Sequence, residues 1–157
     1  MGSGSGNSVR RWSPNEEKVH VVDDFSPKTR ATRALIVEDN PDLATTLTVA
    51  LATVHCHSTC AANGEIAIKT LLDNDYDVII CDMSMPAMAG DMFYLAAERA
   101  RPKYRRRFIF MTGHHGEKKW DDFAREKGCL ILWKPFQMQT FLEAVGIILR
   151  QVREGAR

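Results

Sequence analysis

The chain has 157 residues, of which 45% are hydrophobic and 26% charged, and its formal net charge is +1. Such a composition is ordinary for a globular protein, and the near-zero net charge excludes an overall attraction to nucleic acid or acidic lipid. No apolar run approaches the roughly 18 residues of a membrane span, and we expect neither a signal peptide nor a membrane segment, hence a cytoplasmic location. The length suits one domain with tails.

The N-terminal part of the chain is polar and is not expected to belong to the domain. Residues 1–6 look like an expression scar, and residues 7–32 are typical of a linker or flexible arm. Within that arm, Val19–Asp24 resembles a strand that ends in two acids, but no amphipathic helix follows it. We therefore place the domain at residues 33–152, with a C-terminal tail at 153–157.

The first predicted strand and helix follow each other closely. Ala34–Val37 is an apolar, β-prone run that leads into Glu38 and Asp39. Asn40 is a good helix cap and Pro41 a good first helical residue, so a helix is expected from about 41 to 53.

A second strand is expected at residues 55–60, and a second helix begins near Asn63-Gly64. Its residues Ile68, Leu71 and Leu72 are predicted to face the core. The stretch 55–60 contains two histidines and two cysteines, but strand alternation puts the two residue types on opposite faces, which argues against a metal site there. We expect the four cysteines of the chain to act as small hydrophobic residues in a cytoplasmic core: Cys56, Cys60, Cys81 and Cys129.

The central strand is predicted at residues 77–82. Val78–Cys81 is continuously apolar, as in a strand buried on both faces, and ends in Asp82. Met85-Pro86 then turns the chain. The nearby methionines could form an adaptable docking lip or simply pack the loop.

The second half of the chain repeats the strand–helix alternation. A third helix follows Gly90 and ends at Pro102, and the remaining strands are expected at 108–111 and 130–133. The remaining helices are expected at 117–127 and 138–152. Five strand–helix units in strict alternation predict an α/β fold with one doubly wound parallel sheet and helices on both faces.

Distinctive polar residues stand where the predicted strands end. Glu38, Asp39, Asp82, Thr112 and Lys134 all take such positions, and the carboxyl ends of parallel strands meet at one edge of a sheet. Clustered acids attract a hard divalent cation such as Mg²⁺. A hydroxyl and an ammonium could then contact a phosphoryl group that Asp82 accepts.

These pieces resemble the receiver (response-regulator) domain of two-component signalling. The resemblance rests on four motifs in order, Leu35–Pro41, Ile79–Pro86 with Gly90, Phe110–Gly113 and Trp133–Phe136. It covers about residues 33–152 and implies a single (βα)5 flavodoxin-like sheet with strand order 2-1-3-4-5.

The resemblance also implies a role for each matching residue. Asp82 would be the phospho-acceptor, Thr112 and Lys134 would contact the phosphoryl group, and Lys134-Pro135 would be a cis peptide. The implied cofactor is Mg²⁺ or Mn²⁺, bound by Asp39, Asp82 and the backbone carbonyl of Ser84, with Glu38 acting through a metal-bound water. The side chains of Ser84 and His114 would tune the phosphoryl lifetime.

One position departs from the family pattern. Ile131 stands three residues before the lysine, where members commonly carry Tyr or Phe as a switch residue, and Trp133 is the aromatic residue nearest the lysine.

Two further polar segments have an ordinary interpretation beside a functional one. The basic run Arg99–Arg107 could touch nucleic acid or an acidic partner, but a solvated loop is favoured. His114 and His115 could bind a metal or tune the site, but exposed loop histidines are favoured.

The expected function is a phosphorylation switch rather than a turnover enzyme. The partner would be a histidine kinase or a histidine phosphotransfer domain, and no direct nucleic acid contact is expected. The chain would be a single-domain regulator or the C-terminal receiver of a hybrid histidine kinase, the context we favour slightly. One alternative is a pseudo-receiver that binds partners without phosphate. The other is an aspartyl-phosphate hydrolase, which would need a second acid where Ser84 stands.

Overall fold

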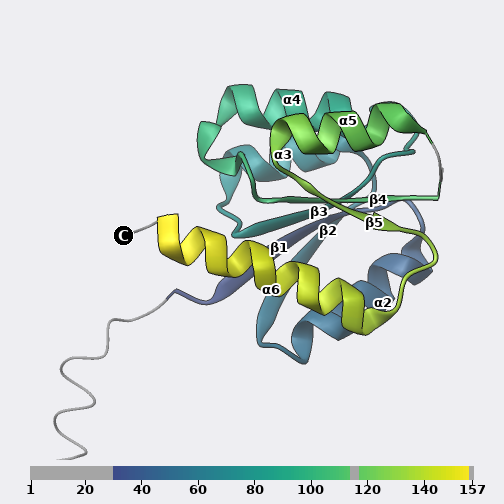
Figure 1. The fold of residues 1–157 in the computed structure, drawn as a ribbon. Helices are drawn as coiled ribbons and strands as arrows, with labels where there is room; N and C mark the ends of the chain where they lie inside the picture. Colours follow the sequence, from purple (N-terminus) through teal and green to yellow (C-terminus); the bar gives the residue numbers. More distant parts are fainter. Residues whose placement is uncertain (1–29, 114–116, 156–157) are drawn as a thin grey trace, which may run out of the picture. The chain divides into compact units, whose positions relative to one another are not determined.

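The computed structural model describes residues 30–113 and 117–155, and these form a parallel five-stranded sheet with helices on both faces (Figure 1). The strands are β1 (Thr32–Val37), β2 (Cys56–Ala61), β3 (Val78–Asp82), β4 (Phe108–Thr112) and β5 (Leu130–Trp133). The helices are α2 (Pro41–Ala52), α3 (Gly64–Asp73), α4 (Gly90–Ala100), α5 (Lys118–Lys127) and α6 (Met138–Gly155), with a 3₁₀ turn η1 (Pro102–Tyr104).

The sheet has the strand order β2-β1-β3-β4-β5, and every neighbouring pair is parallel. This confirms the predicted α/β fold and the 2-1-3-4-5 order. Strands β3 and β4 are buried along their whole length, which explains why their sequences are continuously apolar rather than alternating. The sheet order changes direction between β1 and β3, the place where open α/β sheets form ligand crevices.

Each face of the sheet has its own hydrophobic core. Helices α3, α4 and α5 cover one face, and α2 and α6 cover the other (Figure 1). The first core is rich in aromatic rings, with Tyr94 in edge contact with Phe108 at 4.8 Å between ring centroids. The second core is mainly aliphatic. Packing of helices against both faces therefore fixes the position of the sheet and of the residues at its strand ends.

The ends of the helices follow the local sequence. The Asn40 side chain accepts hydrogen bonds from the backbone N–H groups of Asp42 and Leu43, and Asn63 caps α3 in the same way. Helix α5 ends at Gly128, whose φ of 68° lies in the left-handed region that glycine adopts without strain.

Several sequence-based details are wrong. Leu72 is 49% exposed rather than in the core, because the buried stripe of α3 is centred on Gly64, Ala67 and Leu71. Cys60 is exposed, whereas the other three cysteines are buried. Helix α6 continues to Gly155, so the predicted tail begins within the helix. The expression scar, the arm to residue 29 and its strand-like segment lie outside the described residues.

Within the described part of the chain, no helix is both long and apolar enough to cross a membrane. Met83 and Met85 are buried, which favours loop packing over a docking lip for these two residues.

We expect the centre of β3 to dominate stability. Ile80 is fully buried there, so Ile80→Ala should lower the free energy of unfolding by about 2–5 kcal/mol through lost burial and a residual cavity. Urea denaturation measures this loss. Val49→Ala removes an apolar side chain that is 62% exposed and serves as the control, with an expected change within about 0.5 kcal/mol. Equal losses in the two variants would contradict the core assignment.

Candidate functional site

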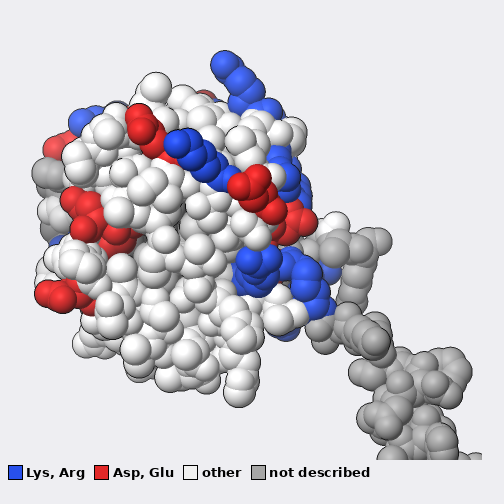
Figure 2. Space-filling view, turned by 180° about the vertical axis from the view of Figure 1, so that it is seen from behind, with Lys and Arg blue, Asp and Glu red and all other residues white. Residues whose placement is uncertain are grey.

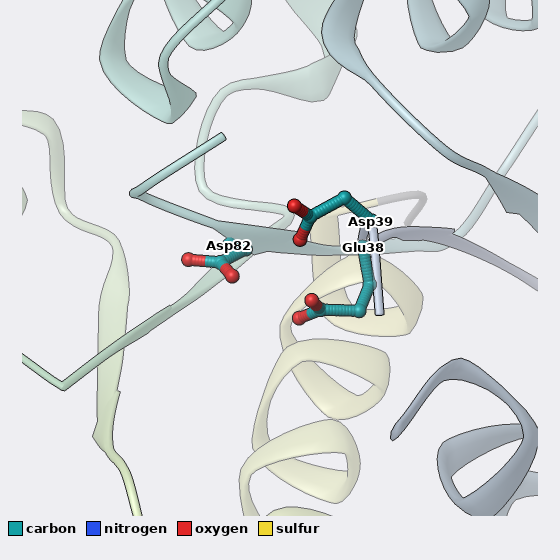
Figure 3. A group of neighbouring side chains, drawn as sticks. All are labelled: Glu38, Asp39 and Asp82. Carbon is teal, nitrogen blue, oxygen red and sulfur yellow. The ribbon is translucent and has the colours of Figure 1, made fainter. Parts of the chain in front are cut away.

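Three acidic side chains meet where β1 and β3 end (Figure 3). Glu38 and Asp39 directly follow β1, and Asp82 is the last residue of β3. One carboxylate oxygen from each of the three side chains lies within 4.8 Å of the other two. Glu38 and Asp82 are buried and Asp39 is exposed, so the cluster opens to solvent on one side.

Lys134 brings a positive charge to this cluster from the end of β5. Its Nζ donates to Asp82 Oδ2 at 3.0 Å and to Glu38 Oε2 at 3.2 Å. The Glu38 side chain is only 1% exposed and that of Asp82 8%, so both acids depend on this ammonium for charge compensation. With all groups ionised, three carboxylates and one ammonium leave two negative charges.

Backbone groups fix the orientation of the two buried acids. The N–H of Ser84 donates to Asp82 Oδ1 at 2.8 Å, so both oxygens of Asp82 have a donor. The N–H of Asn40 donates to Glu38 Oε1 at 3.1 Å. The sequence predicts Asn40 as a helix cap but does not predict this contact of its backbone N–H with Glu38. The one sequence signal for the contact is the cap position, because the chain turns there and passes beside the end of β1.

Burial and the mutual proximity of these groups shift the pKa values of Glu38 and Lys134. Burial raises the pKa of Glu38 from 4.5 to about 7; the Asn40 N–H opposes this rise and the Asp82 charge adds to it. Burial lowers the pKa of Lys134, but the hydrogen bond and charge of Asp82, together with Glu38, outweigh it, and the net direction is upward. Lys134 therefore stays charged while Glu38 is poised to bind a proton near neutral pH.

Thr112 lies beside Asp82 through the register of the sheet. Asp82 pairs with Met111, and Thr112 is the next residue and ends β4. Its side chain is fully buried, and its carbonyl accepts the N–H of Lys134 at 2.8 Å. The structure thus brings Thr112 and Lys134 to the same edge as the three acids.

The loop after β3 closes tightly on the site. The N–H of Gly90 donates to the carbonyl of Met83 at 3.2 Å, and a Cβ at Gly90 would lie 2.8 Å from the Asp82 carbonyl oxygen. Ala87 has a φ of 69° in this loop, a conformation that costs a non-glycine residue energy. Close approach between the start of α4 and the end of β3 explains why glycine stands at position 90.

The remaining predicted residues fall in different places. Ser84 is exposed and its N–H orients Asp82, whereas His114 lies outside the described residues. The Lys134-Pro135 peptide is cis, as predicted. Ile131 packs against the aromatic-rich core together with Trp120. Within the described residues, no metal-type cluster is found around β2.

Comparison with known proteins agrees with this geometry. The family model for the response regulator receiver domain matches residues 34–146, which is most of the chain. The chain therefore belongs to the response regulator receiver family and is a receiver domain of two-component signalling.

One curated relative carries the same family description, and solved structures share the fold. The response regulator receiver protein CpdR of Brucella abortus (strain 2308) is 26% identical over 113 residues, covering 72% of this chain and 92% of that protein. The chemotaxis protein CheY4 of Vibrio cholerae has a TM-score of 0.69 at 24% identity, covering 76% of this chain and 100% of that one. A structure of adenylate cyclase from Rhodopirellula baltica has a TM-score of 0.74 at 25% identity, covering 81% and 93%.

Gly90 gives a test of the tight loop. Gly90→Ala should destabilise the protein by about 1–3 kcal/mol because its Cβ would overlap backbone atoms of Asp82 and Met83. Gly146→Ala in α6 is the control: its Cβ meets only the end of Arg150 at 3.9 Å, and removing a helical glycine should stabilise by about 0.5–1 kcal/mol. Thermal melts of both variants measure the two directions, and a neutral Gly90→Ala would contradict the close approach.

Glu38 should make the metal-free protein less stable as the pH rises. The folded state holds the Glu38 proton up to about pH 7, whereas the unfolded chain releases it near 4.5. The stability of wild type relative to Glu38→Gln should therefore fall by about 3 kcal/mol across this window and stay level above it. Urea denaturation in a chelating buffer at a series of pH values measures the difference. A difference independent of pH would show that Glu38 titrates normally.

Proposed function

We propose that Asp82 accepts a phosphoryl group from a phosphohistidine of a partner histidine kinase or phosphotransfer domain. The observation that carries this proposal is the group of three carboxylates with Lys134 at the edge of the sheet. Membership of the receiver family supports it independently.

The donor set suits one hard divalent cation. Carboxylate oxygens are the ligands that Mg²⁺ prefers, and two net negative charges match its charge. Asp39 and Asp82 would hold the ion with the Ser84 carbonyl, and Glu38 would act through a metal-bound water; Mn²⁺ has the same ligand preference. When bound, the cation neutralises phosphoryl oxygens so that a dianion can approach the acids.

Each side chain of the site has its own role in the proposed phosphoryl transfer. An Asp82 oxygen attacks the phosphorus, the new O–P bond forms as the N–P bond of the donor breaks, and the electron pair leaves with the imidazole. Asp82 already has an N–H donor on Oδ1 from Ser84 and the ammonium of Lys134 on Oδ2. The Lys134 ammonium and the Thr112 hydroxyl would contact the transferred phosphoryl oxygens.

The product of the reaction is the phosphorylated protein itself rather than a released small molecule. The new group adds a charge of about −1.5 to −2 beside Lys134 and Thr112, and it would switch the binding surface for a downstream partner. The chain thus catalyses its own modification. Ser84 and His114 flank the acceptor and Thr112 in sequence, so they would set the lifetime of the phosphoryl group.

Phosphotransfer tests the proposal directly. Phosphate from a panel of autophosphorylated histidine kinases should label wild type in Mg²⁺, and intact mass should show one added phosphoryl group. Asp82→Asn should lose labelling completely, because the amide is not a nucleophile under these conditions. Asp73→Asn, an exposed acid at the end of α3, should label like wild type.

Repeating the experiment with a chelator shows whether a loss of labelling comes from loss of metal or from unfolding. Labelling should fall by at least about a hundredfold in EDTA, because the acids then repel the incoming dianion. Circular dichroism in EDTA should remain that of the folded domain. Absence of labelling from every kinase, together with no response of tryptophan emission to Mg²⁺ and beryllofluoride, would favour a pseudo-receiver.

A further inference from the structure

A cavity of about 770 Å³ lies at the other end of the sheet, between the loop that precedes β4, the turn at Gly128 and the last turns of α6. Small-molecule sites have volumes of about 300–1,000 Å³, so the space is sufficient for a nucleotide-sized ligand. Its lining is given by nine residues: Lys103, Arg105, Arg106, Arg107, Gly128, Gln151, Val152, Glu154 and Gly155.

Positive charge is concentrated in this cavity although the chain as a whole has a net charge of only +1. Four cations line it, against one carboxylate, Glu154. Figure 2 shows the wider pattern on one face: blue atoms lie mostly toward the right, with some red atoms among them, and the left edge carries mainly red ones. The cavity is thus locally positive, which the overall charge does not reveal.

Acidic side chains of the protein neutralise only part of this positive charge. Lys103 pairs with Asp75, and Arg105 Nε donates to Glu98 at 2.8 Å. Arg107 Nη1 donates to the carbonyl of Tyr76, an uncharged acceptor. Among the described residues, no carboxylate pairs with Arg106, which is exposed. Arg106 and Arg107 therefore keep charge available for a ligand.

The loop that carries these cations is held in place before any ligand binds. Tyr104 is fully buried beneath it, and its hydroxyl donates to the carbonyl of Asn74 at 3.2 Å. Arg107 lies over the Tyr104 ring at 5.9 Å. Arg106 has a φ of 61°, a strained conformation for a residue with a side chain, and its stem lies 3.5 Å from the Cβ position of Gly128.

The two walls of the cavity differ in chemistry. The loop wall is cationic, and arginine forks bind phosphate oxygens through paired hydrogen bonds. The α6 wall offers Gln151, a donor and an acceptor, with Val152, the small Gly155 and the carboxylate of Glu154, which can accept from ligand hydroxyls. A ligand that matches both walls has a multiply charged phosphate end and a neutral end that can form hydrogen bonds.

We infer that this cavity binds a nucleoside polyphosphate, with its phosphates on Arg106 and Arg107 and its nucleoside against the end of α6. The site is separate from the acidic cluster and does not depend on phosphorylation of Asp82. Nucleotide binding there would give the receiver domain a second input signal, at the end of the sheet opposite the acidic cluster.

Calorimetric titration with ATP in EDTA tests the inference, because the chelator removes any contribution of metal at the acidic cluster. Wild type should bind ATP saturably, and Arg106→Glu should weaken binding by about tenfold to a hundredfold. Lys69→Glu makes the same change of charge at an exposed site on α3 and should weaken binding by less than about twofold. Asp82→Asn should bind like wild type, which separates this result from the phosphotransfer test.

Two more arms distinguish a built site from general attraction to anions. Arg106→Gly removes the side chain and relieves the positive φ, so its melting temperature should equal or exceed that of wild type while its ATP affinity falls. Gln151→Ala should weaken ATP but leave inorganic tripolyphosphate unchanged. The inference is overturned if ATP does not saturate, if Lys69→Glu is as damaging as Arg106→Glu, if tripolyphosphate binds as tightly as ATP, or if only duplex DNA or poly-glutamate binds.

Discussion

The bridge from Lys134 to Glu38 and Asp82 is the interaction on which the acidic cluster depends most. Two almost fully buried carboxylates would each cost several kcal/mol without a counter-charge. One ammonium serves both, at 3.2 and 3.0 Å, and still leaves the cluster negative. The single ammonium allows the two acids to be buried but leaves the cluster with a net negative charge, which is the property on which the proposed binding of a cation and a phosphoryl group rests.

The parallel sheet gives the molecule two chemically different ends. The carboxyl ends of β1 and β3 carry the acids, whereas the loop that enters β4 carries arginines and a lysine. Because all strands run in the same direction, each end collects residues from sequence-distant loops. The two sets of charges are therefore separated by the length of the buried strands.

Much of the fold and of the acidic cluster could be predicted because the relevant signals are local. Apolar runs ending at Asp82, Thr112 and Lys134 give both the strands and the side chains at their ends. The prediction that Leu72 faces the core was wrong, because helical spacing alone does not show where the buried stripe of a helix is centred. Membership of the receiver family is now shown, whereas the roles of the individual site residues remain predictions.

Other properties could not be read from the sequence because they depend on three-dimensional neighbours. The raised pKa of Glu38 needs its burial and the nearby Asp82 charge, and the Asn40 N–H contact needs the turn after β1. The basic run looked like a solvated loop because the sequence does not show that the end of α6 forms the opposite wall.

Sequence separation in the lysine bridge has a consequence for how the chain is made. Lys134 lies 96 residues after Glu38 and 52 after Asp82. While β5 is still inside the ribosome, the nascent chain has Glu38 and Asp82 but lacks the ammonium of Lys134. Burying Glu38 at that stage would cost free energy, because no opposite charge would compensate it. We therefore expect the sheet and the acidic cluster to form together, late in synthesis.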